Sequence, residues 1–313
     1  MDQFIVSLMN GIVYGLLLFM VSAGLTLIFG MMGVLNFAHA SFYMLGAYFA
    51  YTLQGVIGFW PAVVAAPILV GLIGVAVERF FLRRVHHHGH AHELLLTFGL
   101  SFIIAESIKL FYGNFPVDYR IPAALDVPAF SVGGAQYPVY RLLMGGIAIA
   151  MFAAIYLLLT RTRVGIVVRS AIYKPRMAEA LGHNVPLVFM GVFGVGAALA
   201  GLAGAVAGAF YTTNPNMALE LGVMVFVVVV VGGLGSLGGA MLASLLIGLV
   251  TSLAVGVDRS LADLLALVGA GDWARSVGGL LTLKVSSLSA TLPFALMLLI
   301  LLVRPSGLMG EKG

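Results

Sequence analysis

Two groups of residues have the types and spacing that metal or nucleotide chemistry uses. The histidine run His86–His92 could bind a transition metal through its imidazole nitrogens, with Glu93 as the nearest carboxylate. Gly233–Gly238 fits the G-x-G-x-x-G pattern of dinucleotide-binding loops, and Asp258 follows at about the right distance. The histidines, however, lie in a short loop beside arginines, and the glycines precede an uncharged apolar run. We therefore expect a flexible loop and a tight break between helices, with no metal or cofactor bound.

Polar residues inside long apolar stretches form a second set of candidates. Asn36 and His39 lie far from any charge, so each must find a hydrogen-bond partner or line a wet cavity. They are interpreted either as a buried cap at a helix break or as part of a pathway. Glu106 and Lys109 are three residues apart on one helix face and could pair, either structurally or as lining of a pathway.

The elements that position these residues follow from the composition. Of the 313 residues, 61% are apolar and only 9% are charged, whereas soluble domains have about 25% charged residues. No Asp, Glu, Lys or Arg occurs in Gln3–Val77. We therefore predict an all-α, polytopic integral membrane protein with about 8–10 transmembrane helices, some of them broken or re-entrant. Helices are predicted near Ile5–Gly30, Ser41–Gly58, Pro61–Leu82, Leu94–Tyr112, Leu142–Thr160, Leu187–Tyr211, Val223–Val231, Ala240–Val257 and Leu288–Val303.

Glycines divide and pack these helices. Gly204 and Gly208 form a G-x-x-x-G pair, which is typical of closely packed membrane helices. Leu25–Ala40 and Val223–Gly239 each read as an apolar helix, a break that contains glycine, and then the start of another apolar helix. This similarity indicates a possible internal repeat of two halves, an arrangement that places interrupted helices near the substrate in many transporters.

The basic residues predict the orientation of the chain. Arg79, Arg83 and Arg84 close one predicted helix, and five more basic residues crowd the loop Arg161–Pro186, so both segments are expected in the cytoplasm. Within that loop, Met177–Leu181 reads as a short helix that ends at Gly182. The segments expected outside are the N-terminus, Asn114–Tyr140, Thr212–Glu220 and Asp258–Lys284, whereas the C-terminus is expected in the cytoplasm.

Several classes of function lack their signatures in this sequence. There is no cysteine, so disulfides and thiolate metal sites are excluded. There is no Walker A motif, so any ATP that drives this protein must be hydrolysed by another subunit. The net charge of +4 comes from residues that flank membrane segments and does not indicate a nucleic-acid partner. No chain of carboxylates lies at the membrane midplane, which weakens a proton-coupled mechanism.

In addition, the sequence resembles the permeases of branched-chain amino acid ABC importers, in particular the H-type partner of the two-permease leucine/isoleucine/valine system. The resemblance covers almost the whole chain, in order. Its residues are Gly33–His39 (GVLNFAH), Glu78-Arg79, Arg161–Arg169, Met177–Asn184 (MAEALGHN), Phe193–Gly208, Tyr211 with Pro215, Val231–Ala240 (VGGLGSLGGA) and Arg304–Gly310 (RPSGLMG).

This resemblance implies a single permease domain, 1–313, with a cytoplasmic coupling loop at 161–186, in a multi-pass protein of the bacterial inner membrane. Its implied partners are a second permease, two cytoplasmic ATPases that use the ATP, and a periplasmic amino-acid-binding protein. The chain itself is then not an enzyme. The residues implied in coupling to the ATPases are Met177, Glu179, Ala180, Leu181, Gly182 and Asn184. Those proposed for the substrate pathway or gate are Asn36, His39, Ser41, Gly233, Gly235 and Gly238.

Other functions remain open at this point. Urea and short-amide importers use similar permeases, so the substrate is not fixed by the resemblance. A self-sufficient secondary transporter or channel would carry its substrate without ATP. A metal-dependent membrane enzyme would use the histidines of His86–His92 and bind metal in stoichiometric amounts.

Overall fold

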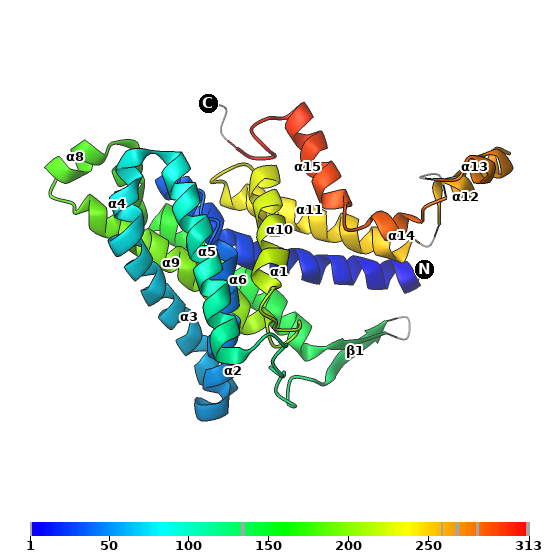
Figure 1. Ribbon diagram of the computed structural model, residues 1–313, viewed down its shortest axis with the longest axis horizontal. Coiled ribbons are helices and arrows are strands. Elements are labelled where there is room, and N and C mark those ends of the chain that lie inside the picture. Colours follow the sequence, from blue (N-terminus) through cyan, green and yellow to red (C-terminus); the bar gives the residue numbers. More distant parts are fainter. Residues whose placement is uncertain (1, 133–134, 258, 267–268, 280–281, 311–313) are drawn as a thin grey trace.

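The computed structural model describes residues 2–132, 135–257, 259–266, 269–279 and 282–310, and it is dominated by helices (Figure 1). The helices up to the middle of the chain are α1 Asp2–Met32, α2 His39–Ile57, α3 Phe59–Val77, α4 Arg83–Val85, α5 His90–Tyr112, α6 Val139–Arg161, α7 Arg163–Tyr173 and α8 Pro175–Ala180. Those that follow are α9 Val185–Ala207, α10 Met217–Gly232, α11 Leu237–Gly256, α12 Leu261–Ala266, α13 Gly271–Val277, α14 Val285–Leu288 and α15 Leu292–Val303.

Each apolar segment predicted from the sequence contains a helix in the structure, and most ends differ by a few residues. The helix predicted at Val223–Val231 begins earlier, at Met217, and the one predicted at Leu288–Val303 is divided between α14 and α15. Six of the described helical segments are long and apolar enough to cross a membrane. Two shorter apolar helices, α10 and α15, accompany them. The short helix predicted before the glycine break is α10, which has 16 residues and ends at Gly232. The polytopic, helical membrane architecture is thus confirmed.

A small antiparallel hairpin departs from the all-α expectation. Strand β1, Pro128–Val132, pairs with β2, Ala135–Pro138. The segment around it contains four prolines, each of which lacks the backbone N–H that a helix interior needs. An extended ribbon satisfies part of this backbone by cross-strand pairing instead.

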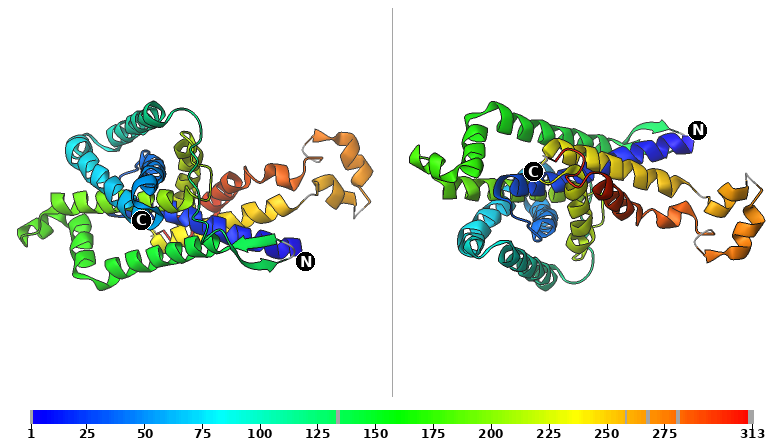
Figure 2. Two further views of the ribbon diagram at one scale, coloured as in Figure 1. Left: turned by 90° about the horizontal axis from the view of Figure 1, so that it is seen from below. Right: turned by 90° about the horizontal axis from the view of Figure 1, so that it is seen from above.

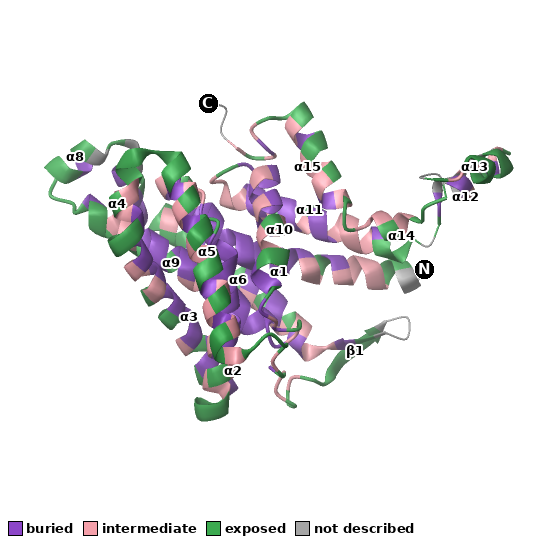
Figure 3. Cartoon of the chain, in the orientation of Figure 1, coloured by how far each residue is buried: buried purple, intermediate pink, exposed green. Residues whose placement is uncertain are grey.

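Helix α1 lies at the centre of the fold and runs antiparallel to α11 (Figures 1 and 2). Its most apolar 18-residue stretch is 78% buried within the chain, whereas that of α5 is only 17% buried. Buried residues gather where α1, α2, α9 and α10 meet, and α5 exposes most of its length (Figure 3). The core is therefore built around α1, and α5 is peripheral.

Close packing of α2 against α9 depends on glycine. A Cβ at Gly204 would overlap the carbonyl oxygen of Tyr43, and a Cβ at Gly208 would lie 2.8 Å from the Ala47 Cβ. Any larger residue would push the two backbones apart, at the expense of the dispersion contacts that hold helices together in lipid. The packing role predicted for the G-x-x-x-G pair is confirmed, and this contact fixes the position of α2.

Hydrogen bonds between loops show which loops lie together at each of the two ends of the molecule. We call the end with the two basic segments, around Arg83 and in the loop 161–186, the arginine end. There the Arg83 guanidinium donates to the Pro186 carbonyl over 2.9 Å and joins the two segments. The backbone N–H groups of Leu308 and Met309 bond to the end of α10, so the C-terminal segment also lies there. Positive charge favours the cytoplasmic side, and the predicted cytoplasmic segments do share one end of the molecule.

The second end, the hairpin end, collects the segments predicted to be external. Val117 forms a β-bridge with Thr213, and the Tyr137 hydroxyl donates to the Val6 carbonyl over 2.9 Å. The Ser252 hydroxyl donates to Ser7 over 2.7 Å, so the end of α11 lies beside the N-terminus. These contacts agree with the predicted topology, in which the N-terminus and these loops share one side.

Helices α12 and α13 project from the hairpin end beyond the N-terminus (Figure 1). A reciprocal cap starts α12. The Ser260 backbone N–H donates to the Asp263 carboxylate over 2.9 Å, and the Asp263 N–H donates to the Ser260 hydroxyl over 3.2 Å. The Ser260 backbone bond, then its hydroxyl and Arg275, lower the pKa of Asp263 to about 2. The predicted external segment is therefore partly helical, although residue 258 lies outside the described residues.

Candidate functional site

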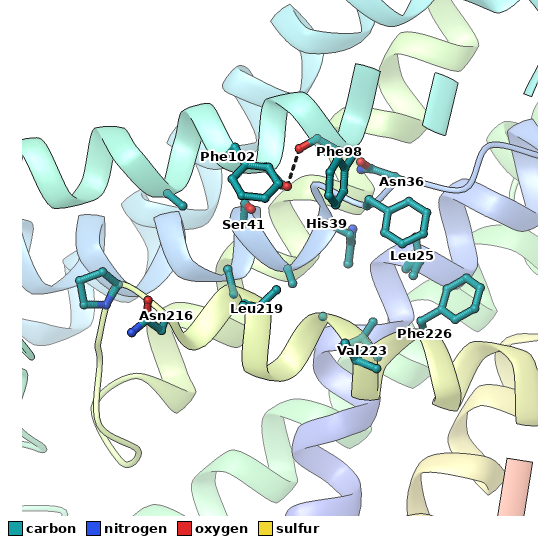
Figure 4. A pocket seen from close by; sticks show the side chains of 18 of the residues that line it. Leu25, Asn36, His39, Ser41, Phe98, Phe102, Asn216, Leu219, Val223 and Phe226 are labelled. Atoms are coloured by element: carbon teal, nitrogen blue, oxygen red, sulfur yellow. Dashed lines mark hydrogen bonds between the residues drawn. The ribbon is translucent and has the colours of Figure 1, made fainter. Parts of the chain in front are cut away.

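A groove of about 310 Å³ lies between α2, α5 and α10 (Figure 4). Pockets that bind small molecules commonly have volumes of roughly 300–1,000 Å³ and apolar walls. The residues that line the groove are Leu25, Leu35, Asn36, Phe37, His39, Ala40, Ser41, Phe98, Ser101, Phe102, Ala105, Glu106, Lys109, Pro215, Asn216, Ala218, Leu219, Gly222, Val223, Val225 and Phe226. Helix α5 forms one wall, α10 forms the other, and the start of α2 forms the floor.

The long axis of the groove follows the axes of α5 and α10. On α5 the lining extends from Phe98 toward Lys109, and on α10 it extends from Phe226 back toward Asn216. Since α5 begins at the arginine end and α10 begins at the hairpin end, the groove leads from one end toward the other. This is the direction that a transport pathway needs.

The floor is shaped by the break between α1 and α2. Gly33 has φ +66, a conformation that glycine adopts without strain, and it turns the chain out of α1. The Asn36 Oδ1 accepts from the Ala38 N–H over 3.0 Å, and the Phe37 N–H donates to the Thr97 hydroxyl over 3.2 Å. The break is thus held to α5 by this hydrogen bond, which places the side chains of the break at the groove.

Two buried polar groups on this floor have no partner among the described residues. Asn36 is 4% exposed and His39 is 1% exposed. The Asn36 Nδ2 and the His39 Nδ1 form no hydrogen bond there. The His39 Nε2 lies 2.9 Å from the Val21 carbonyl, which can only accept, so Nε2 carries the proton and Nδ1 is a free acceptor in the neutral ring. An unpaired donor and an unpaired acceptor, both of them buried atoms, therefore belong to two residues that line the apolar floor.

Aromatic rings surround these polar groups toward the arginine end. The Phe37 ring stacks on Phe226 at 6.0 Å between centroids and meets Phe98 edge-on at 6.4 Å. Phe98 in turn contacts Phe102 at 4.9 Å. Phe37 therefore bridges the two walls of the groove. None of these rings is among the candidate residues predicted from the sequence.

A charged pair lies toward the other end of the groove. The Lys109 ammonium donates to the Glu106 carboxylate over 2.6 Å, so the predicted pairing is confirmed. Both residues line the groove on α5, a turn or two before that helix ends at Tyr112. The structure thus combines the two interpretations left open by the sequence, because the residues pair and also line the cavity.

The structure brings some of the predicted pathway residues together and keeps others apart. Asn36, His39 and Ser41 share the floor of the groove. Gly233, Gly235 and Gly238 are outside its lining. Gly233 packs on the C-terminal segment at Gly310, and Gly235 packs on Gly30 of α1. The glycine break is the tight helix break that was predicted, whereas its part in the pathway stays a prediction.

The loop predicted to couple to ATPases forms α8 at the arginine end. The helix begins at Pro175, two residues earlier than predicted, and Gly182 with φ +87 follows it. Ala178 is buried, whereas Met177, Glu179, Ala180 and Leu181 are exposed. Asn184 caps α9, since its Oδ1 accepts from the Leu187 N–H over 3.1 Å. The helix therefore presents an unpartnered face, and no contact within the chain tests its predicted role.

The histidine run is organised around one buried carboxylate. Glu93 accepts from His86, and its second oxygen lies 3.2 Å from the His90 Nδ1. Within the described part of the chain, no three histidine, aspartate or glutamate side chains are arranged to hold a metal ion. The metal-enzyme alternative therefore gains no support from this loop.

The fold and the groove together define a multi-pass membrane protein with a cavity along the direction of crossing. The family model for the permease component of branched-chain amino acid transport systems matches residues 7–301. The chain therefore belongs to that family and is one component of a transport system.

Relatives of this family match over nearly the whole chain. The high-affinity branched-chain amino acid transport system permease protein BraD of Pseudomonas aeruginosa is 26% identical over 99% of this chain and 96% of its own length. LivH of Salmonella typhimurium is 26% identical over 98% of this chain and 96% of its length. A probable LivH of Methanocaldococcus jannaschii is 27% identical over 78% of this chain and 79% of its own. A solved structure, PsaBC from Streptococcus pneumoniae in complex with Fab, aligns with 13% identity and a TM-score of 0.45, covering 95% of this chain and 91% of that chain, a likeness too weak to support an argument.

Proposed function

We propose that this chain is a permease subunit of an ATP-driven importer of the ABC type, and that it moves branched-chain or other hydrophobic amino acids inward. The match to the permease family over residues 7–301 carries this proposal. The groove between α2, α5 and α10 supports it, because this cavity follows the crossing direction and has apolar walls with few polar groups.

The lining of the groove fits the proposed substrates. A branched apolar side chain gains free energy against aromatic and aliphatic walls, at about 25 cal/mol per Å² of surface removed from water. Urea has no apolar part and would lose hydrogen bonds with water without such a gain. Asn36 and His39 offer the donor and the acceptor that the polar part of an amino acid needs at the floor.

The groove is open on one side in this chain. Exposure of the charged Glu106 and Lys109 to lipid on that side would be costly. We propose that a second permease subunit covers it. A periplasmic binding protein would deliver the substrate at the hairpin end, and two ATPase subunits would bind at the arginine end. In this arrangement ATP is used by the partners, and the permease requires no cofactor of its own.

Helix α8 is the proposed contact with the ATPase. Its exposed Met177 and Leu181 are apolar groups at an end of the molecule expected in the cytoplasm, where they gain from burial against a partner. Ala178 anchors the helix by packing with Ala171 and Val185. The Arg83 bond to Pro186 then links movement of this loop to α4.

Uptake by the reconstituted complex tests the proposal. The chain is assembled with its partner subunits in proteoliposomes, and accumulation of leucine, isoleucine, valine and urea is measured with and without ATP and binding protein. We expect uptake of the three amino acids that requires both additions. Uptake of urea alone would reassign the substrate, and flux without ATP would support a secondary transporter instead.

Coupling is tested at Gly182 and Met177. Gly182→Arg places a side chain at a φ that only glycine adopts readily, and Met177→Asp puts a charge on the exposed face of α8. We expect both variants to reach the membrane and to lose most ATP-driven uptake. Ser170→Asp, on the exposed side of α7, is the matched control and keeps uptake. Unchanged uptake in both α8 variants would refute the docking role.

A further inference from the structure

We propose that Glu106 and Lys109 form a first head-group site of the groove, toward the hairpin end, which binds the carboxylate and the ammonium of an entering zwitterionic α-amino acid before its polar part reaches Asn36 and His39. The inference rests on the proposed function, since it assigns a task to residues of the same pathway. Neither the family match nor the relatives' names assign a role to these two residues.

The position of the pair is the first argument. Both side chains belong to a helix with the length and composition of a membrane span, and both line the groove. Lys109 lies three residues and Glu106 six residues before Tyr112, which is roughly 5 and 9 Å along a helix. Ionised groups inside a membrane span are costly unless they face a protein interior or a wet cavity, and the Glu106 side chain, which is 66% exposed in this chain alone, needs such surroundings. A groove that holds water or substrate gives this pair such a surrounding.

The charges of the pair are the second argument. The Lys109 ammonium and the Glu106 carboxylate are 2.6 Å apart and satisfy each other while the groove is empty. A zwitterion carries the same two charges at a similar short separation. Its carboxylate can accept from Lys109 while its ammonium donates to Glu106, so the site stays neutral at every stage. An isolated lysine or glutamate would instead select an acid or an amine.

The surroundings of the pair are the third argument. Phe102 lies four residues before Glu106 and therefore on the same face of α5, one turn farther into the groove. Leu219 and Val223 of α10 lie across from it (Figure 4). A head group held at the pair directs its side chain toward these three apolar groups. The site thus distinguishes the two ends of a hydrophobic amino acid.

The absence of cysteine from this chain allows a direct binding assay. Ala105→Cys introduces one thiol into the groove lining, and its labelling by a maleimide is followed on this chain within the assembled complex in nanodiscs. L-leucine is added to slow labelling, and leucinamide, which lacks the carboxylate, is compared with it. Ser131→Cys on the exposed hairpin is the control for general thiol reactivity.

We expect leucine to protect the thiol at concentrations about tenfold lower than leucinamide, since one charge-assisted contact is lost in the amide. Lys109→Gln should weaken protection by leucine about tenfold and leave that by leucinamide nearly unchanged, so that the two ligands become equal. Glu106→Gln should weaken protection by both ligands. Lys109→Arg and Glu106→Asp, which keep the charges, should stay within about threefold of the parent chain. Asp118→Asn disrupts an ion pair in an exposed loop and should change nothing.

Two sets of results would overturn the inference. One is protection by leucine that is the same in the Lys109→Gln and Glu106→Gln variants as in the parent. The other is an equal loss for leucine and leucinamide in Lys109→Gln, or failure of both glutamine variants to assemble, since either marks the pair as structural. Absence of protection by leucine in the parent chain would refute the groove as the pathway, whereas the importer function itself stands or falls on the uptake measurement described above.

Discussion

The two helix breaks of this chain have similar sequence patterns and different structures. The first, between α1 and α2, contains one glycine with positive φ, at Gly33, and lines the groove with Asn36 and His39. The second, between α10 and α11, has positive φ at Gly233 and Gly235 and lies outside the groove. One break therefore leaves polar groups free at a cavity, whereas the other is filled by backbone.

The difference lies in how each break satisfies its polar groups. At the second break, the Ser236 hydroxyl caps α11 by accepting from the Gly239 N–H over 3.1 Å, and the C-terminal segment bonds to Val231 and Gly232. At the first, Asn36 uses its oxygen locally and keeps its amide nitrogen free. An unsatisfied buried group lowers stability by about 1–3 kcal/mol. Its retention at the groove is what the proposed pathway role of Asn36 would explain, whereas the satisfied polar groups of the second break are those of a structural joint.

The largest expected effect is on the stability of the second break. Gly233→Ala requires an alanine at φ +100 and places its Cβ against the backbone of Gly310. Strain of this kind and the forced displacement together should lower stability by about 3 kcal/mol or more. Thermal unfolding in detergent measures this, with Gly58→Ala as a control that has similar φ, +84, and open space around it. Equal shifts in the two variants would contradict the tight packing.

A smaller effect, on uptake, is expected at the first break. His39→Gln keeps a donor that can reach the Val21 carbonyl and takes the acceptor away from the Nδ1 position, because the carbonyl oxygen of glutamine lies at the end of the side chain. Because a hydrogen bond to a charged ammonium contributes about 1.5–3 kcal/mol, uptake should fall about tenfold or more while thermal stability changes little. Normal uptake in this variant would make His39 a structural residue, and the contrast between the two breaks would disappear.

The cap of α11 should have a modest effect on stability alone. Ser236→Ala removes the side chain that accepts from Gly239, and loss of such a cap lowers stability by about 1 kcal/mol. Uptake per folded complex should stay at the parent level. Ser236→Asp, which keeps an acceptor, should restore the unfolding temperature. Reduced transport by a well-folded Ser236→Ala protein would show that the second break also serves the pathway.

The smallest effect, on leucine uptake, is expected from replacing apolar side chains that are exposed to a similar degree in the two breaks. Phe37 in the first break is 48% exposed, and Leu234 in the second is 46% exposed. Phe37→Ala opens the aromatic bridge across the groove and should lower leucine uptake about threefold, or about 0.6 kcal/mol. Leu234→Ala should leave uptake unchanged. Equal rates of leucine uptake in the two variants would show that the aromatic bridge has no part in the pathway.

Much of the fold could be predicted because the solvent constrains it. Uncharged stretches such as Gln3–Val77 are stable only as helices in lipid, and the basic loops mark one side. The hairpin was missed because four prolines exclude a helix without specifying a strand pair. A position of Asn36 and His39 at a cavity was one of the two interpretations, because a polar group in an apolar stretch needs either a hydrogen-bond partner or contact with water.

The rest of the site could not be read from the sequence. Phe98, Phe102 and Phe226 lie on apolar helices, where a ring facing a groove looks the same in sequence as one facing lipid. The wall opposite α5 is formed by residues between Pro215 and Phe226 of the structure, and none of these was among the predicted pathway residues. Which helix faces α5 depends on packing between distant segments, and one sequence contains no direct record of it.

The peripheral position of α5 has a mechanical consequence. This helix is joined to its neighbours by Gly89 at one end, with φ +92, and by Gly113 at the other, with φ +84, and neither glycine has another atom within 4 Å of an added Cβ. Its packing is mainly against α2. Single polar contacts hold the two ends of this helix, since Glu93 bonds to His86 and the Tyr112 hydroxyl lies 2.6 Å from the Thr52 hydroxyl of α2. A neighbouring subunit that displaces α5, and so changes the width of the cavity, therefore has to break these few contacts rather than a packed apolar core.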